Sequence, residues 1–145
     1  MNYDKLFFDL SDSVHKEISS EELSVINYNL KHEINIKETK EKIKKVLDSS
    51  VKPFLESISK KDLESIALDF EKKIENLQNT ANAVFEEEGN AYASAALDLS
   101  LCNYVIKYQE KVSDKNSDLQ KTAKKGNRFT NFIKNLFNVN EDKNL

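Results

Sequence analysis

The sequence predicts an all-α fold: an antiparallel helical bundle of about four main helices around a central apolar helix at residues 90–112, followed by a C-terminal amphipathic helix. Glycine and proline are scarce, with 2 and 1 among 145 residues, so the turns that sheets and barrels need are missing. Apolar residues instead recur at three and four positions. We expect a bundle domain at residues 1–113, a polar linker at 114–127, a short basic amphipathic helix at 128–139 and a disordered terminus at 140–145.

A contrast in charge predicts the central helix. Between Gly89 and Lys107 the only charged residue is Asp98, in a chain that is 32% charged. At 3.6 residues per turn the apolar residues fall on two opposite sides, and a helix that is apolar on two sides packs on two sides. One side holds Ala91, Tyr92, Ala95, Leu99, Cys102 and Ile106, and the other holds Leu97, Leu101, Tyr104, Val105, Tyr108 and Val112. The run is too short and too interrupted to span a bilayer. Asn90 is a candidate cap for its first turn.

The N-terminal part predicts two helices and one ambiguous segment. Apolar spacing indicates a helix at residues 3–18, and Ser19 followed by Glu22 is a capping-box pattern that begins a second helix near Ser20. Residues 24–37 alternate between apolar and polar, as in a strand, but fit a helix equally well. We favour a helix, because the chain offers no second strand. A strand that pairs in a dimer or with another protein is the alternative.

The middle of the chain predicts a broken helix and then a long one. Pro53 disfavours helix at the residue before it, so we expect a kink or short break at residues 48–52. Clean three-and-four spacing then continues from Leu63 to Val84. Three adjacent acids, Glu86, Glu87 and Glu88, follow at a helix C-terminus, where negative charge is unfavourable. Either the helix continues through Gly89, or the three glutamates serve a partner.

The predicted core contains residues from two of these helices. Leu99 and Ile106 of the central run, with Phe70 and Leu77 of the long helix, are expected to be almost fully buried. Cys102 lies on the same apolar side as Leu99, so we interpret it as a buried thiol rather than a nucleophile.

The residues that carry catalysis or metal binding are few. Only two histidines, His15 and His32, and one cysteine are present, at no ligand spacing, so we expect no metal and no cofactor. Two glycines cannot build a phosphate loop or a nucleophile elbow. Asp98 is the notable acid, because it lies between two leucines. We expect it to be half-exposed or paired on a polar strip with Ser94, with a partner-clamping role as the alternative.

Charge is unevenly distributed along the chain. Residues 1–120 carry 16 basic and 23 acidic side chains, a net charge of −7 within an overall net charge of −3. The next basic residues, with no acid among them, are Lys121, Lys124, Lys125, Arg128 and Lys134. They surround an apolar set of Phe129, Phe132, Ile133, Leu136 and Phe137. This segment is expected to dock on the bundle, on a partner or on a membrane surface. Nucleic acid is disfavoured because the chain has a single arginine.

These observations predict a non-enzymatic protein-binding module. An acidic helical protein can mask or neutralise a basic partner protein, as an immunity protein, antitoxin or chaperone does, and complementary charge speeds such association. Glu86, Glu87, Glu88 and Asp98 are the candidate partner-binding residues. The alternative is a peripheral-membrane or assembly adaptor anchored by the basic tail. A homodimer is compatible with either. The single cysteine and the acidic N-terminus predict a cytoplasmic protein.

Overall fold

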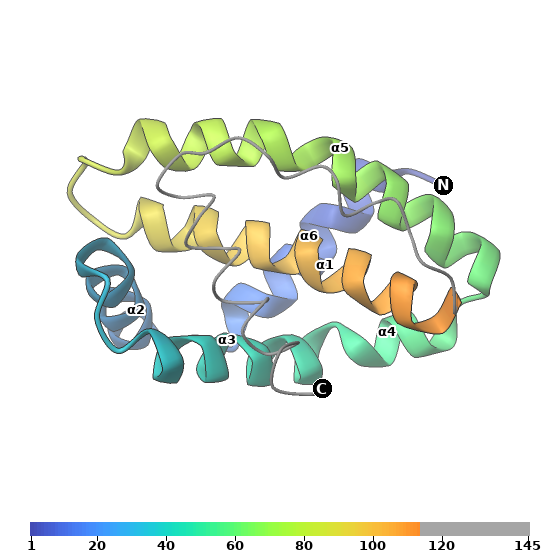
Figure 1. Cartoon of the computed structure of the whole chain (residues 1–145), viewed down its shortest axis with the longest axis horizontal. Coiled ribbons are helices and arrows are strands. Elements are labelled where there is room, and N and C mark those ends of the chain that lie inside the picture. Colours follow the sequence, from blue (N-terminus) through green and yellow to red (C-terminus); the bar gives the residue numbers. More distant parts are fainter. Residues whose placement is uncertain (114–145) are drawn as a thin grey trace.

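The structure, a computed structural model, describes residues 1–113, and among these it contains α-helices and no strand. The helices are α1 (Tyr3–Lys16), α2 (Ser20–His32), α3 (Ile36–Ser50), α4 (Lys52–Ser57), α5 (Lys60–Val84) and α6 (Ala91–Ser113). α5 and α6 lie side by side and antiparallel, and α2 crosses one end of the bundle (Figure 1). The predicted all-α bundle is confirmed. The linker, tail helix and terminus predicted at 114–127, 128–139 and 140–145 lie outside the described residues.

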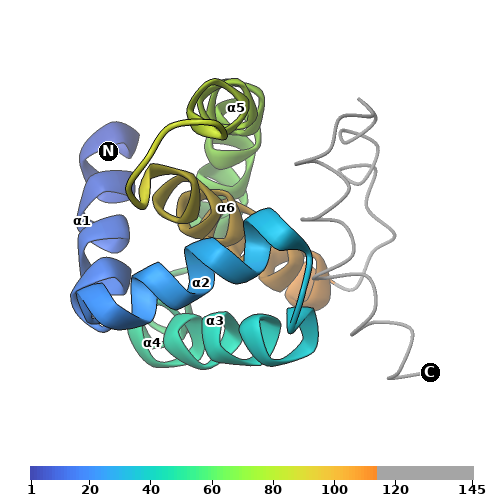
Figure 2. The same ribbon diagram turned by 90° about the vertical axis from the view of Figure 1, so that its left-hand side faces the viewer.

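α6 packs against α1, α2, α3 and α5 (Figure 2). Of its 23 residues, 12 are buried, and among them are residues from both of the apolar sides that the sequence shows. Leu99 and Leu101 are each 0% exposed although they belong to opposite sides. The absence of charge between Gly89 and Lys107, apart from Asp98, is what allows the helix to be covered on both sides.

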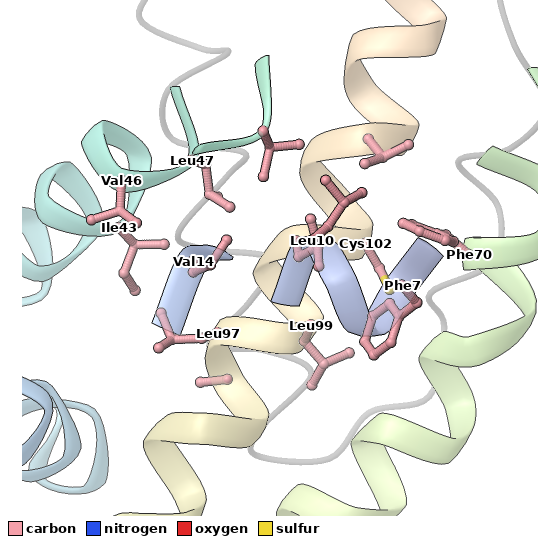
Figure 3. Close-up of a cluster of buried hydrophobic side chains, with 14 of the residues drawn as sticks. Phe7, Leu10, Val14, Ile43, Val46, Leu47, Phe70, Leu97, Leu99 and Cys102 are labelled. Atoms are coloured by element: carbon pink, nitrogen blue, oxygen red, sulfur yellow. The ribbon is translucent and has the colours of Figure 1, made fainter. Parts of the chain in front are cut away.

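The core contains buried residues from all six helices, and Figure 3 shows the part in which α1, α3, α5 and α6 meet. Phe7 of α1 meets Phe70 of α5 edge to face, with ring centroids 5.5 Å apart. Leu99, Ile106 and Phe70 are buried as predicted, and so is Cys102. The prediction for Leu77 was wrong: it is only partly buried, and Gln78 beside it is 9% exposed. Figure 3 also labels Leu10, Val14, Ile43, Val46, Leu47 and Leu97 in this cluster.

The start of α2 forms as predicted. The Ser19 side chain accepts from the Glu22 amide, and the Glu22 carboxylate accepts from the Ser19 amide, which completes the capping box. α1 ends at Lys16, two residues earlier than expected. The ambiguous segment at 24–37 is helical up to His32 and again from Ile36, so the prediction of a helix is confirmed and the strand alternative is wrong. The chain then turns through Glu33 and Asn35, both left-handed at φ 56° and 49°.

The remaining boundaries place the acidic triplet outside any helix. α3 ends at Ser50 and α4 begins at Lys52, so the break predicted before Pro53 is present. α5 ends at Val84 and does not continue through Gly89, which adopts φ +87°. Residues 86–88 therefore belong to the turn between α5 and α6. This turn follows the negative end of α5 but precedes the positive end of α6, so the helix dipoles act on it in opposite directions.

Candidate protein-binding surface around α2

The acidic turn is the first part of the candidate surface. The side chains of Glu86, Glu87 and Glu88 are exposed, and none of them has a hydrogen bond or ion pair with the described residues. The turn lies at the end of the bundle that α2 crosses (Figures 1 and 2). Three exposed carboxylates are therefore presented together at one end of the bundle.

Asn27 of α2 fixes this turn to the bundle. Its side-chain nitrogen donates to the Gly89 carbonyl oxygen at 3.1 Å, and its side-chain oxygen accepts from the Ala93 amide at 3.0 Å. Ala93 is in the first turn of α6, whose amides have no partner within their own helix. Asn27, which is 9% exposed, thus supplies from another helix an acceptor that we expected to come from Asn90. The Asn90 side chain donates instead to Ser24 Oγ at 3.0 Å.

Lys31 adds a second attachment one turn further along α2. Its Nζ donates to the Glu87 carbonyl oxygen at 2.9 Å and lies 5.8 Å from the centroid of the Phe85 ring. The Phe85 ring in turn packs edge to face on Tyr92, with centroids 4.7 Å apart. Because Lys31 bonds the backbone rather than a carboxylate, it holds the turn in place while the glutamate side chains stay open to solvent.

An exposed apolar strip lies on α2 beside the turn. Val25 is 58% exposed and Tyr28 is 55% exposed, and Ile34 in the following turn is 40% exposed. They are three of the six large hydrophobic residues that are exposed within residues 1–113. The Tyr28 ring stacks on His32, with centroids 4.1 Å apart, which holds the ring against the helix. Clustered exposed apolar side chains of this kind mark interaction sites.

A groove of about 490 Å³ between α2 and α3 continues the strip. An ion pair joins the two helices at this groove, where the Glu22 carboxylate of α2 accepts from Lys42 Nζ of α3 at 2.7 Å. This bond and the one from the Ser19 amide lower the pKa of Glu22. Beneath it the Asn29 side chain donates to Thr39 Oγ1 at 3.2 Å. The groove is lined by Glu21, Glu22, Val25, Ile26, Asn29, Asn35, Glu38, Thr39 and Lys42. The lining contains three carboxylates and a single lysine, Lys42, which is already paired with Glu22. The groove is therefore acidic.

We define the α2 surface as the acidic turn at residues 86–88, the strip of Val25 and Tyr28, and the groove between α2 and α3. The sequence singled out the glutamates and the segment 24–37 separately. The structure brings them together, because Ser24, Asn27 and Lys31 lie on the side of α2 that contacts the turn.

Asp98 does not belong to this surface. Its Oδ1 accepts from Ser11 Oγ at 2.7 Å and lies 3.3 Å from His15 Nε2, so it faces α1. It lies seven residues after Ala91, roughly 10 Å along the helix axis. The Asp98 side chain is 23% exposed, which agrees with the paired, half-exposed position expected of it.

The Ser11, His15 and Asp98 side chains do not have the arrangement of a catalytic triad. In a triad the serine bonds the histidine, which removes its proton, and the carboxylate orients the histidine from the other side. Here Ser11 and His15 both approach the same oxygen of Asp98. This geometry satisfies a partly buried carboxylate and ties α1 to α6.

Within residues 1–113 no three histidine, cysteine or acidic side chains come close enough together to hold a metal ion. No helix in the same part of the chain combines the length and the apolar character needed to cross a bilayer. The tail residues Lys124, Lys125, Arg128, Phe129, Phe132, Ile133, Leu136 and Phe137 lie outside the described residues.

Comparison with known proteins gives no relative. No family model, no curated protein and no solved structure matches this chain.

Proposed function

We propose that this protein is a non-enzymatic binding module that neutralises a basic partner protein through the α2 surface. The proposal rests on one observation: side chains of α2 bond the turn that bears the exposed carboxylates of residues 86–88, and α2 also bears the exposed apolar side chains of Val25 and Tyr28. Lys31 and Asn27 bond the backbone of the acidic turn at 2.9 and 3.1 Å, and no described cation pairs with the three carboxylates. Such a surface offers a cationic partner both charge and apolar contact.

Electrostatics determines which partner fits. Opposite charge across an interface raises the association rate and rejects acidic competitors, whereas buried apolar and aromatic groups supply most of the affinity. Tyr28 is suited to the second role, because it combines a large ring with a hydroxyl and its stacking on His32 limits its motion. The partner we propose is therefore a basic protein with an apolar group among its cations. Masking such a partner is the action of an immunity protein, an antitoxin or a chaperone.

Affinity capture with matched variants tests this proposal. Immobilised wild-type protein is compared with a variant carrying Glu86→Gln, Glu87→Gln and Glu88→Gln. A control variant carries Glu56→Gln, Glu64→Gln and Glu75→Gln, three exposed acids on α4 and α5 that change the net charge equally. We expect one basic protein to be retained by wild type and control and to be lost from the first variant. Equal capture by all three proteins, or capture of an acidic protein, contradicts the proposal.

A further inference from the structure

We infer that the basic segment of the same chain, residues 121–139, occupies the α2 surface when no partner is bound. The inference rests on the proposed function only in using the same surface, and it adds a regulatory step: a partner must displace the segment in order to bind.

The charges of the two regions are complementary. Residues 121–134 carry five basic side chains and no acid. On the α2 surface the carboxylates of Glu21 and Glu38 line the groove, and those of residues 86–88 are exposed on the neighbouring turn. None of these five carboxylates has a cationic partner among the described residues. The Debye length at physiological salt is about 8 Å, so dissolved ions only partly screen the attraction between a basic side chain of the segment and a carboxylate closer than this.

The apolar residues are complementary as well. In the segment, Phe129, Phe132, Ile133, Leu136 and Phe137 recur at three and four positions. On the α2 surface, Val25 and Tyr28 are exposed and Ile26 lines the groove. An amphipathic segment recognises a groove by placing residues at this spacing into it. A second copy of the bundle is a poorer occupant, because two acidic surfaces repel each other.

The chain is long enough to reach. The last described residue, Ser113, ends α6 at the end of the bundle away from α2 (Figure 1). The 23 residues of α6 are about 35 Å long. Residues 114–127, when extended, span about 46–50 Å, so residue 128 can return along the bundle to the α2 surface. A covalent link of this length also gives an effective concentration of about 1 mM, so a weak contact suffices to keep the surface occupied.

Photo-cross-linking in the purified full-length chain tests the inference. The photoreactive residue p-benzoylphenylalanine replaces Tyr28 in one protein and Leu68 in the other. Leu68, on α5, is 49% exposed and serves as the matched control. We expect cross-links from position 28, and not from position 68, to peptides within residues 121–139. Mixing isotope-labelled with unlabelled chains should give products within single chains only. Equal yields from both positions, or products between chains, would overturn the inference.

Charge reversal gives a second test, in which the cross-linking yield is first lowered by one set of substitutions and then restored by a compensating set. Recovery of the yield would show that the first loss was not caused by misfolding. Lys124→Glu, Lys125→Glu and Arg128→Glu together should reduce the yield from position 28 at least fivefold. Adding Glu86→Lys, Glu87→Lys and Glu88→Lys should restore most of it. An unchanged yield after the first set, or no recovery after the second, would contradict docking. Since no partner is present, failure here leaves the proposed function standing, whereas failed capture with successful cross-linking rejects the proposed function alone.

Discussion

The side-chain oxygen of Asn27 on α2 accepts a buried hydrogen bond of 3.0 Å from the Ala93 amide in the first turn of α6. The same side chain donates to the Gly89 carbonyl oxygen. One amide group therefore satisfies a helix N-terminus and fixes the acidic turn, which makes Asn27 the structural link between the fold and the α2 surface.

Replacing Asn27 should destabilise the protein more than replacing an ordinary polar residue on the surface. Asn27→Leu leaves the buried Ala93 amide without its partner, and an unsatisfied buried group costs about 1–3 kcal/mol. We expect a loss of that size in the free energy of unfolding, measured with urea. Asn76→Leu, at an exposed position of α5, is the control and should change stability by less than about 0.5 kcal/mol. Equal effects of the two substitutions would contradict the role given to Asn27.

Burial of α6 on two sides gives a second prediction. Leu99 is 0% exposed, so Leu99→Ala should cost about 2–5 kcal/mol through lost burial and the cavity left behind. The comparison is Leu68→Ala, at a leucine that is 49% exposed, which should cost less than about 1 kcal/mol. Chemical denaturation measures both. A loss at Leu99 below about 0.5 kcal/mol would show that α6 is not the buried element described here.

Much of the fold could be predicted because single residues carried strong local signals. The charge gap from Gly89 to Lys107 indicated α6, Ser19 and Glu22 indicated the start of α2, and Pro53 indicated the break at Val51. The end of α2 was harder to predict. It depends on the left-handed conformations of Glu33 and Asn35, and neither is a glycine.

The candidate surface could be predicted only in pieces. The glutamates at 86–88 stood out by sequence alone, and the alternation at 24–37 drew attention to α2. That Asn27 and Lys31 bind the acidic turn could not be foreseen, since 56 residues or more separate the partners in sequence and no local pattern marks their contact. Asp98 was singled out because it lies between two leucines, and its partners are Ser11 and His15 on α1.

A contact between α3 and α6 predicts a dependence on pH. The Tyr104 hydroxyl donates to Asp48. Burial opposes ionisation of Asp48, but the hydrogen bonds from Tyr104 and Lys44 outweigh burial and lower the pKa of Asp48. A carboxyl whose pKa is lower in the folded than in the unfolded state stabilises the fold above its ordinary value of 3.8, and this contribution is lost as the pH falls through the folded-state pKa.

Tyr104→Phe should therefore destabilise the protein by about 0.5–1.5 kcal/mol at pH 7 and by less at pH 3. Urea unfolding at both pH values measures the difference. The control is Tyr28→Phe, at an exposed tyrosine, which should have no comparable effect. A carboxyl titration followed by NMR should also show a higher pKa for Asp48 in Tyr104→Phe. An unchanged pKa would show that Tyr104 does not stabilise the Asp48 carboxylate.

Removal of the tail should leave the bundle folded. The buried cluster within residues 1–113 draws on all six helices, so we expect deletion of residues 121–145 to shift the midpoint of thermal unfolding by no more than a few degrees. A collapse of the midpoint would place Phe129, Phe132 and Leu136 in the core.

Flotation of the full chain with phosphatidylserine vesicles distinguishes the membrane-anchor alternative. Binding that disappears with residues 121–145 would favour an anchor over a segment that docks on α2.

The acidic triplet should matter for association more than for stability. Because residues 86–88 lie between the negative end of α5 and the positive end of α6, replacing the three glutamates by glutamine should change the free energy of unfolding by less than about 0.5 kcal/mol. The triple variant can then be compared with wild type as an equally folded protein.

The most direct test of the central claim, that the α2 surface binds a basic protein, is the association rate constant with the captured partner, measured by stopped flow over a series of salt concentrations. We predict that the Glu86, Glu87 and Glu88 to glutamine variant associates about tenfold more slowly than wild type at low salt, and that the difference shrinks as salt screens the charges. The variant with glutamine at Glu56, Glu64 and Glu75 should remain close to wild type. Equal rates for the two variants at low salt would contradict the claim.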